Sequence, residues 1–333
     1  MTRPLSTRQR PRHAGVKFDG DAPKWFNSPV RFHEGTLQSV ADFLPEFERR
    51  SFALTQPGND RSRLNERLDT IVRRPFGEDG SFIPVGVVSK GYTLVPHHSV
   101  VAVARRVLGE ADIAPEEVKA ELCITEYGER MALSLYLPEE FAFDPGDGHP
   151  LTMRLECFNS VDGSTRFRAL MGWYRFVCSN GMIIGVTQTE VRRRHVGEMG
   201  LDDVQTVLGY GLQAADVEKR NFEQWRQRTV APDDLVPWIN QELKNGWGFK
   251  AAARFYHIAR TGHDAEIAGP YKENTPTTIP VRRKGPVPGA TNECRNLYDV
   301  SQILAWLAKE RRDVQEQRAW REAIHGLLAP LIH

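Results

Sequence analysis

The sequence predicts an α+β protein, with an antiparallel β-sheet and flanking helices followed by a helical C-terminal subdomain. Three observations lead to this fold class. Two glycine-containing turns each lie between β-rich runs, a clear helix precedes the first of these hairpins, and helical spacing dominates beyond about residue 200. A helix followed by four strands favours an antiparallel sheet with helices packed against it.

Residues 1–36 are basic, with scattered proline and glycine. No apolar region typical of a secretory signal follows the first methionine. No run approaches the ~18 apolar residues that a membrane span needs. We therefore expect a basic, largely disordered arm at the start of a cytoplasmic protein that does not enter a membrane.

Apolar spacing predicts two helices in the next segment, over 37–50 and over 59–73, with Pro45 splitting or kinking the first. Runs rich in Val, Ile, Tyr and Phe predict strands over 82–88 and 91–95.

A further helix is expected after Pro96. Its apolar face repeats at helical spacing, Ser99 is the expected N-cap, and Gly109 lies where a C-cap belongs.

Two hairpins are predicted after this helix. The first joins 121–125 to 131–137, and the second joins 151–158 to 167–178. The second connection, 159–164, contains Asp-Gly, a strong hairpin signal because both residues tolerate positive φ.

The last third of the chain has helical spacing over 204–225, 235–243, 249–259 and 296–328, with a break expected near Asp313. Residues 269–292 hold five prolines and are expected to form a long exposed loop. The predicted organisation is therefore an arm (1–36), an α+β core domain (37–200) and a helical subdomain (201–333).

Composition excludes several function classes. The 44 basic and 43 acidic residues nearly cancel, so an electrostatic argument must be local. The four cysteines form no metal-binding spacing, and no common nucleotide-binding or zinc-protease motif is present. No metal or cofactor is predicted, and whether the protein is an enzyme is left open.

One stretch combines arginine with aromatic residues. Between residues 154 and 195 there are seven arginines and no lysine. Arginine binds phosphate bidentately and stacks on rings, and a basic sheet face with aromatic side chains suits single-stranded nucleic acid. The candidate contact residues are Arg154, Arg166, Arg168, Trp173, Tyr174, Arg175, Phe176, Arg192, Arg193, Arg194 and His195. The alternative is that these arginines are solvated or ion-paired and that the aromatic residues pack across strands.

Two polar segments invite a catalytic interpretation. Asn159, Asp162 and Ser164 could form a catalytic cluster, but a turn uses the same residue types. Cys178 could be a nucleophile, but it would need a base and an oxyanion hole that the sequence does not locate.

Five segments stand out together: Val85-Gly86-Val87-Val88-Ser89 with Gly91-Tyr92, Asn159-Ser160-Val161-Asp162-Gly163-Ser164, Arg175-Phe176-Val177-Cys178-Ser179-Asn180-Gly181, Arg194-His195 and Asn296 to Gln302. In this order they resemble the phage/plasmid-like protein family known as domain of unknown function 932. The resemblance covers roughly residues 70–325. Such proteins often carry histidine where this chain has Val161.

The resemblance implies a mobile-element setting, in which phages or plasmids handle incoming DNA, but it implies no activity. A looser likeness is to single-strand-annealing recombinases, which also place a helix before antiparallel strands and another helix, and which form ring-shaped homo-oligomers.

These observations lead to the hypothesis of a single-stranded DNA-binding protein, with an annealing or DNA-protecting role. Two alternatives stay open. One is an anti-defence or regulatory protein that binds a host protein through its helical C-terminal third. The other is a metal-dependent nuclease or hydrolase that uses Asn159, Asp162 and His195.

Overall fold

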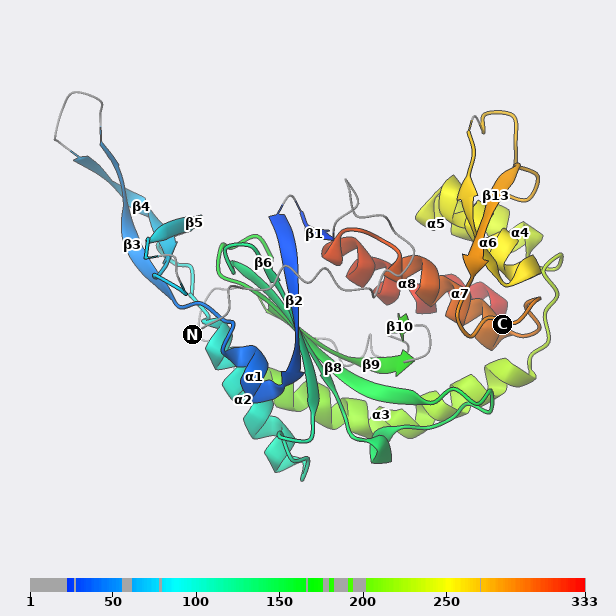
Figure 1. Ribbon diagram of the computed structural model, residues 1–333, viewed down its shortest axis with the longest axis horizontal. Helices are drawn as coiled ribbons and strands as arrows, with labels where there is room; N and C mark the ends of the chain where they lie inside the picture. The colour runs from blue at the N-terminus through cyan, green and yellow to red at the C-terminus, as the bar shows by residue number, and fades with distance from the viewer. Residues whose placement is uncertain are drawn as a thin grey trace.

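The computed structural model describes residues 23–26, 28–55, 62–77, 80–165, 167–175, 180–182, 191–193, 202–269 and 271–332. The predicted α+β class is confirmed. Among these residues the main sheet has eight strands in the order β1-β2-β6-β7-β8-β9-β10, with β11 also paired to β9, and every pairing is antiparallel (Figure 1). The strands are β1 (Lys24–Trp25), β2 (Ser28–Thr36), β6 (Lys119–Thr125), β7 (Arg130–Tyr136), β8 (Leu151–Ser160), β9 (Phe167–Arg175), β10 (Asn180–Met182) and β11 (Val191–Arg193).

Both predicted hairpins are present, as β6–β7 and β8–β9. Each turn contains a glycine with positive φ, Gly128 at 79° and Gly163 at 76°. Glycine adopts this backbone region without the steric cost that other residues incur, so the two turns were readable from local sequence.

Helices lie on both faces of the sheet. The helices α2 (His97–Glu110) and α3 (Asp202–Gln227) lie on one side, and α8 (Val314–Ile332) lies on the other (Figure 1). Alternate residues of β8 and β9 face opposite sides because successive side chains of a strand alternate. Trp173 packs near Phe222 of α3 with ring centroids 6.4 Å apart, whereas Arg168 contacts Glu322 of α8.

A second, three-stranded sheet replaces two predicted helices. It contains β3 (Phe47–Thr55), β4 (Ser62–Arg73) and β5 (Ile83–Ser89), and only α1 (Leu37–Ala41) of the expected 37–50 helix is helical. The helix predictions were wrong over 42–50 and over 62–73, the described part of the expected 59–73 helix. The apolar spacing in 59–73 fits a helix, but Leu64 is 63% exposed while Ile71 is fully buried, so these residues share no apolar face. Backbone pairing of β4 with both β3 and β5 decides the strand.

The boundaries around α2 also differ from expectation. Residues 91–95 form a connection rather than a strand, although Tyr92 and Val95 are buried. The N-cap is Pro96, which makes no side-chain cap, and Ser99 lies inside the first turn. The helix passes through Gly109 and ends at Glu110, with Ala111 as its C-cap. Buried His97 anchors this end, so the helix starts two residues before the expected cap.

Residues 24–36, expected in the disordered arm, form β1 and β2 instead. Seven residues of β2 pair with β6, and Trp25 is fully buried with its ring edge-on to Phe158 at 6.1 Å. The pairing and the buried indole offset the cost of ordering this segment. Residues 1–22 lie outside the described part of the chain.

His33 on β2 gives this strand a predicted pH dependence. Its ring is 7% exposed and stacks on Phe43 at 3.8 Å, and burial, aided by the nearby Arg31 charge, lowers its pKa from 6.5 to about 4. The folded state therefore disfavours the protonated ring. The free energy of unfolding should be unaffected by His33 protonation above pH 6.5, and it should decrease as the pH falls from 6.5 towards 4, because the unfolded chain takes up the proton first.

Urea unfolding across that window tests this dependence. A His33→Gln variant should lose less stability than the wild type between pH 6.5 and 4, because glutamine does not titrate. Equal losses in the two proteins would show that His33 does not drive the change.

The C-terminal third is helical, as predicted, except for one hairpin. The elements are α3, α4 (Val236–Trp238), the π-helical η5 (Ile239–Leu243), α5 (Lys244–Trp247), α6 (Phe249–Thr261), α7 (Leu297–Lys309) and α8, with a short 3-10 turn η2 (Glu139–Phe141) earlier in the chain. The expected loop over 269–292 contains β13 (Val281–Pro286), which pairs with β12 (His263–Ile267). The break between α7 and α8 lies at Asp313, as expected.

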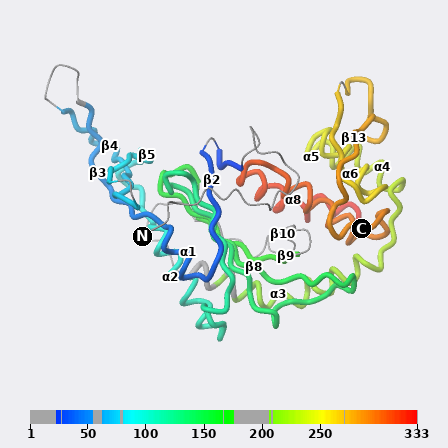
Figure 2. The backbone as a smooth tube through the Cα atoms, viewed as in Figure 1, coloured from blue at the N-terminus to red at the C-terminus, as the bar shows by residue number. Residues whose placement is uncertain are grey.

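One hydrophobic core joins the two parts that the sequence divided at residue 200. It runs from Trp25 through the main sheet to Leu328 of α8. The C-terminal helices therefore pack onto the sheet, and Figure 2 shows α8 lying beside the strands. In the part of the chain that the structure describes, no helix combines the length and the apolar character needed to cross a membrane.

Candidate nucleic-acid interface

The predicted arginine and aromatic residues lie mainly on β8 and β9, on two different faces. Arg154, Arg168 and Tyr174 are on the face that α8 covers in part. Trp173 is on the opposite face, where its ring packs on Phe143 at 4.8 Å and is 2% exposed. The stretch therefore does not form one continuous aromatic surface.

Arg154 is buried in a ring of polar and aromatic side chains. Its guanidinium lies 4.7 Å from the Tyr174 ring and 5.8 Å from the Tyr136 ring, and its Nη2 is 3.1 Å from Glu156 Oε1. Burial is the largest single effect and opposes the charge, but the Glu156 carboxylate together with Tyr136 and Tyr174 raises the pKa of Arg154. Tyr136 in turn donates to Glu121 at 3.2 Å.

Helix α8 brings further charges onto this face. Arg321 donates from Nη1 to both Glu156 oxygens at 3.0 and 2.9 Å. Glu156 is fully enclosed, which favours its neutral form, but the two arginines keep its pKa below the ordinary value. On the next strand Arg168 donates to Glu322 at 3.1 Å, and Glu322 also accepts from Arg318 at 2.6 Å. Each of these arginines thus contacts a carboxylate within the protein, with Glu156 and Glu322 each shared by two of them.

Arg175 is also buried. It is 2% exposed and forms an ion pair with Asp147. The prediction that Arg154, Arg175, Trp173 and Tyr174 lie on an open binding face was wrong, because core packing and internal carboxylates enclose all four. Arginines bearing internal partners fit the ion-paired alternative.

Only some of the remaining candidate residues belong to the part of the chain that the structure describes. Arg192 and Arg193 are in β11, whose backbone pairs with Arg168 and Phe167 of β9, and Asn180 and Gly181 are in β10. The candidates outside the described residues are Arg166, Phe176, Cys178, Ser179, Arg194 and His195.

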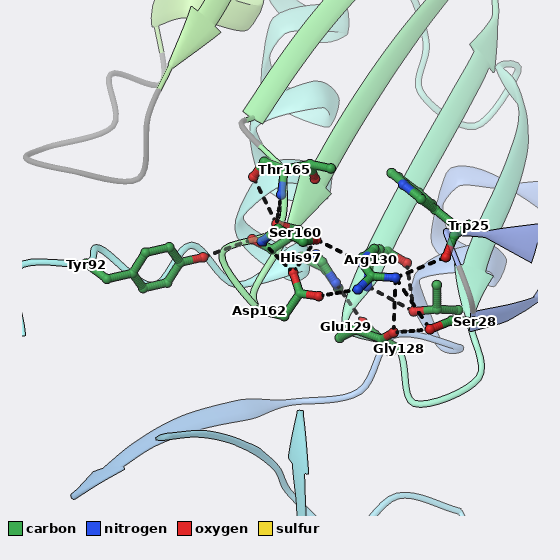
Figure 3. Close-up of polar contacts among 12 residues, drawn as sticks. Trp25, Ser28, Tyr92, His97, Gly128, Glu129, Arg130, Ser160, Asp162 and Thr165 are labelled. Atoms are coloured by element: carbon green, nitrogen blue, oxygen red, sulfur yellow. Dashed lines mark hydrogen bonds and ion pairs between the residues drawn. The ribbon is translucent and has the colours of Figure 1, made fainter. Parts of the chain in front are cut away.

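The Asn159–Ser164 segment forms a hydrogen-bonded turn at the end of β8 (Figure 3). Arg130 donates to Asp162 at 2.7 Å, to Ser164 at 2.8 Å and to the Trp25 carbonyl at 3.0 Å. Asp162 also accepts from the Ser164 backbone N–H at 2.9 Å. Asp162 is therefore occupied by partners within the turn.

Asn159 lies beneath this turn and is fully buried. Its Nδ2 donates to the Val95 carbonyl at 3.0 Å and to His97 Nδ1 at 2.9 Å. His97 Nε2 lies 2.8 Å from the Gly128 carbonyl, which can only accept, so Nε2 carries the proton and Nδ1 accepts from Asn159. Through His97, Asn159 thus links helix α2 to the β6–β7 turn.

The β5 segment docks on the same turn. Tyr92 donates to the Ser160 carbonyl at 3.1 Å, and a Cβ added at Gly86 would lie 2.7 Å from the Asp162 Cα. Two segments that carry the family resemblance therefore meet at one junction between the two sheets. These contacts support the turn interpretation of the cluster over the catalytic one.

Comparison with known proteins confirms the family that the motifs resemble. The model of a family described as "Domain of unknown function (DUF932)" matches residues 84–268, more than half of the chain. The chain belongs to this family. The DUF932 match begins in β5 and ends just after β12, so it includes the whole junction. No curated protein and no solved structure matches the chain.

The DUF932 chain shows no metal centre in the part that the structure describes, where no group of three or more His, Cys, Asp or Glu residues could hold an ion. His195, which the hydrolase hypothesis requires, lies outside that part.

A basic cavity of about 380 Å³ lies among α6, the β12–β13 hairpin and the α7–α8 connection of this DUF932 protein. Sequence reasoning did not predict this cavity, although Arg282, Arg283 and Lys284 are consecutive basic residues. Lys250 and Arg254 are one turn apart on α6, but only the fold brings them to the other cations. The charged residues of its lining are Lys250, Arg254, Glu266, Lys284, Glu310, Arg311 and Arg312.

Partners orient two of these cations. Arg254 forms a bidentate pair with Asp264, at 2.9 and 2.5 Å. Arg311 contacts Glu316 at 3.0 Å and lies 4.5 Å above the Trp320 ring, which stacks on Trp247.

Lys250 and Lys284 are exposed and form no ion pair with the residues that the structure describes. Their ammonium groups are therefore available to an anion that enters the cavity.

Proposed function

We propose that this DUF932 protein binds single-stranded DNA. The basic cavity carries the proposal: five cationic side chains and two carboxylates line it, together with Trp247 and Trp320. A concentration of lysine and arginine on one site attracts a phosphate backbone even when the net charge of the chain is near zero. Its volume is within the usual range of ligand sites, about 300–1,000 Å³.

The order of elements adds support from analogy. Helix α2 precedes the strands β6 to β9, and helix α3 follows them. The sequence likeness to single-strand-annealing recombinases rests on the same order, and that likeness motivates an annealing or DNA-protecting role in a phage or plasmid. Self-association into a homo-oligomer stays a prediction.

The arginine triplet, Arg192 to Arg194, would supply a second group of phosphate contacts. Its first two residues continue the sheet beside Arg168, which Glu322 already neutralises. The phosphate contacts on this side of the protein are therefore assigned to the triplet rather than to β8 or β9.

Removing the two exposed lysines of the cavity should weaken binding to a labelled oligothymidine strand. We expect Lys250→Ala with Lys284→Ala to raise the dissociation constant about tenfold at low salt. The slope of log affinity against log salt should become shallower by about 1.4, since each lost contact to a single strand accounts for about 0.7. Fluorescence anisotropy over a salt series measures both quantities, and a duplex of the same sequence should bind more weakly.

Arg105→Ala with Arg106→Ala is the matched control, because it removes two exposed charges from α2 and should leave the slope unchanged. An Arg192→Ala, Arg193→Ala, Arg194→Ala variant tests the second group of contacts separately. Absence of binding by the wild type at low salt would discard the proposal.

One observation favours a protein partner instead. The β3–β4 hairpin extends away from the body of the molecule (Figure 2), and Leu54 and Leu64 near its end are 68% and 63% exposed. Exposed apolar side chains on a projecting element are typical of a protein-binding surface. If the chain does not bind DNA, copurification of one stoichiometric host protein would support this second candidate.

A further inference from the structure

Glu310 is the least expected residue of the basic cavity. It follows α7, lines the cavity, and has one carboxylate oxygen, Oε1, that is buried without a hydrogen-bond partner. Among the described residues no donor is recorded for either oxygen. The cations around it contact other groups or face the cavity, so the carboxylate is held near positive charge but is not bonded to it.

The positive charges near Glu310 do not fully offset the effect of burial on the pKa of its carboxyl group. Burial raises its pKa, and the nearby Lys309, Arg254 and Lys284 charges only partly oppose that effect. A buried acceptor without a donor is costly, so a donor supplied by a ligand would stabilise this part of the protein. A turn of the side chain towards the cavity would expose this oxygen to a ligand that carries N–H groups, and the bonds formed would remove the cost.

The chemistry of the carboxylate selects the donor. Its two oxygens lie side by side and best accept from two adjacent N–H groups, as they do from arginine. Among the DNA bases, the Watson–Crick edge of guanine offers such a pair, its N1–H and its N2 amino group. Adenine and cytosine place one amino group beside a ring acceptor, and thymine places one N–H between two carbonyls. Unpaired bases in single strands expose these edges to protein side chains.

We infer that the cavity holds a guanine base of the bound strand, with Glu310 accepting from its N1–H and N2 amino group. The inference rests on the proposed function and deepens it. Lys250 and Lys284 then contact the phosphates on either side of that nucleotide. The protein would bind single strands of any sequence but favour those that contain guanine.

A comparison of guanine with hypoxanthine tests this assignment, because hypoxanthine lacks only the N2 amino group. The probes are an alternating thymidine–deoxyguanosine strand and the same strand with deoxyinosine, in a lithium buffer that suppresses guanine quadruplexes. We expect the guanine strand to bind about tenfold more tightly, the gain typical of one hydrogen bond to a charged group. Glu310→Gln should reduce the difference to about twofold or less. Lowering the pH should also reduce it, as the carboxylate gains a proton.

Glu266→Gln is the matched control, since Glu266 lines the same cavity but is exposed and lies near Arg282. It should keep the preference for guanine. Equal binding of the two strands by the wild type, or a preference that survives Glu310→Gln, would overturn the inference and leave the proposed function standing. Failure of both strands to bind would overturn the proposed function itself, and the inference with it.

Discussion

Replacing Glu156 by glutamine is expected to lower the free energy of unfolding by about 3–5 kcal/mol, the cost typical of leaving a buried charge without its partner. Glu156 is 5% exposed and forms an ion pair with Arg154. Both of its carboxylate oxygens also accept from Nη1 of Arg321, which lies on α8. Glutamine has nearly the same shape, but it carries no charge to balance two enclosed guanidinium groups. Urea unfolding followed by circular dichroism measures the change.

Glu316→Gln is the control for this experiment. Glu316 pairs with Arg311 at 3.0 Å, but its side chain is 50% exposed. Exposed ion pairs contribute about 0–1 kcal/mol, so this variant should be close to the wild type. If Glu156→Gln lost no more stability than Glu316→Gln, the charges between β8 and α8 would not hold the helix on the sheet.

Replacing Gly86 by alanine is expected to lower the free energy of unfolding by about 1–3 kcal/mol, the usual cost of overpacking a well-packed site. The added Cβ would lie 2.7 Å from the Asp162 Cα and 3.1 Å from the Asp162 carbonyl oxygen. Both are backbone atoms of a turn that Arg130 fixes, so neither can move away cheaply.

Gly91→Ala is the matched control for Gly86→Ala. Gly91 belongs to the same family segment, but a Cβ added there meets nothing within 4 Å. Equal effects of the two substitutions would mean that the contact of Gly86 with Asp162 does not limit the junction.

The family motifs could be found in the sequence, but their role could not. Asn159, Asp162 and Gly163 carried both a turn signal and a polar cluster suited to catalysis. The structure separates these interpretations, because Arg130 from β7 bonds to Asp162 and His97 from α2 bonds to Asn159. Arg130 is 32 residues from Asp162 and His97 is 62 residues from Asn159, so no local pattern indicates these contacts.

The carboxylate partners of the arginine stretch also could not all be predicted from local sequence. The sequence placed Arg154, Arg168 and Arg175 near aromatic residues on strands, and that placement is confirmed. Their carboxylate partners differ in origin: Glu156 is two residues away, whereas Glu322 is 154 residues away on α8. Composition showed the charges, and only the tertiary structure showed which carboxylate each arginine contacts.

By itself, the sequence determined the α+β class, the two hairpins of the main sheet and the helices α2, α3 and α6, because turn chemistry and apolar spacing act within a few residues. The tertiary structure alone decided that 62–73 is a strand, that β2 joins the sheet, and that Glu310 lies in one cavity with cations from separate elements. Strand pairing and the neutralisation of buried charge are contacts between distant segments, and their energies depend on which segments the fold brings together.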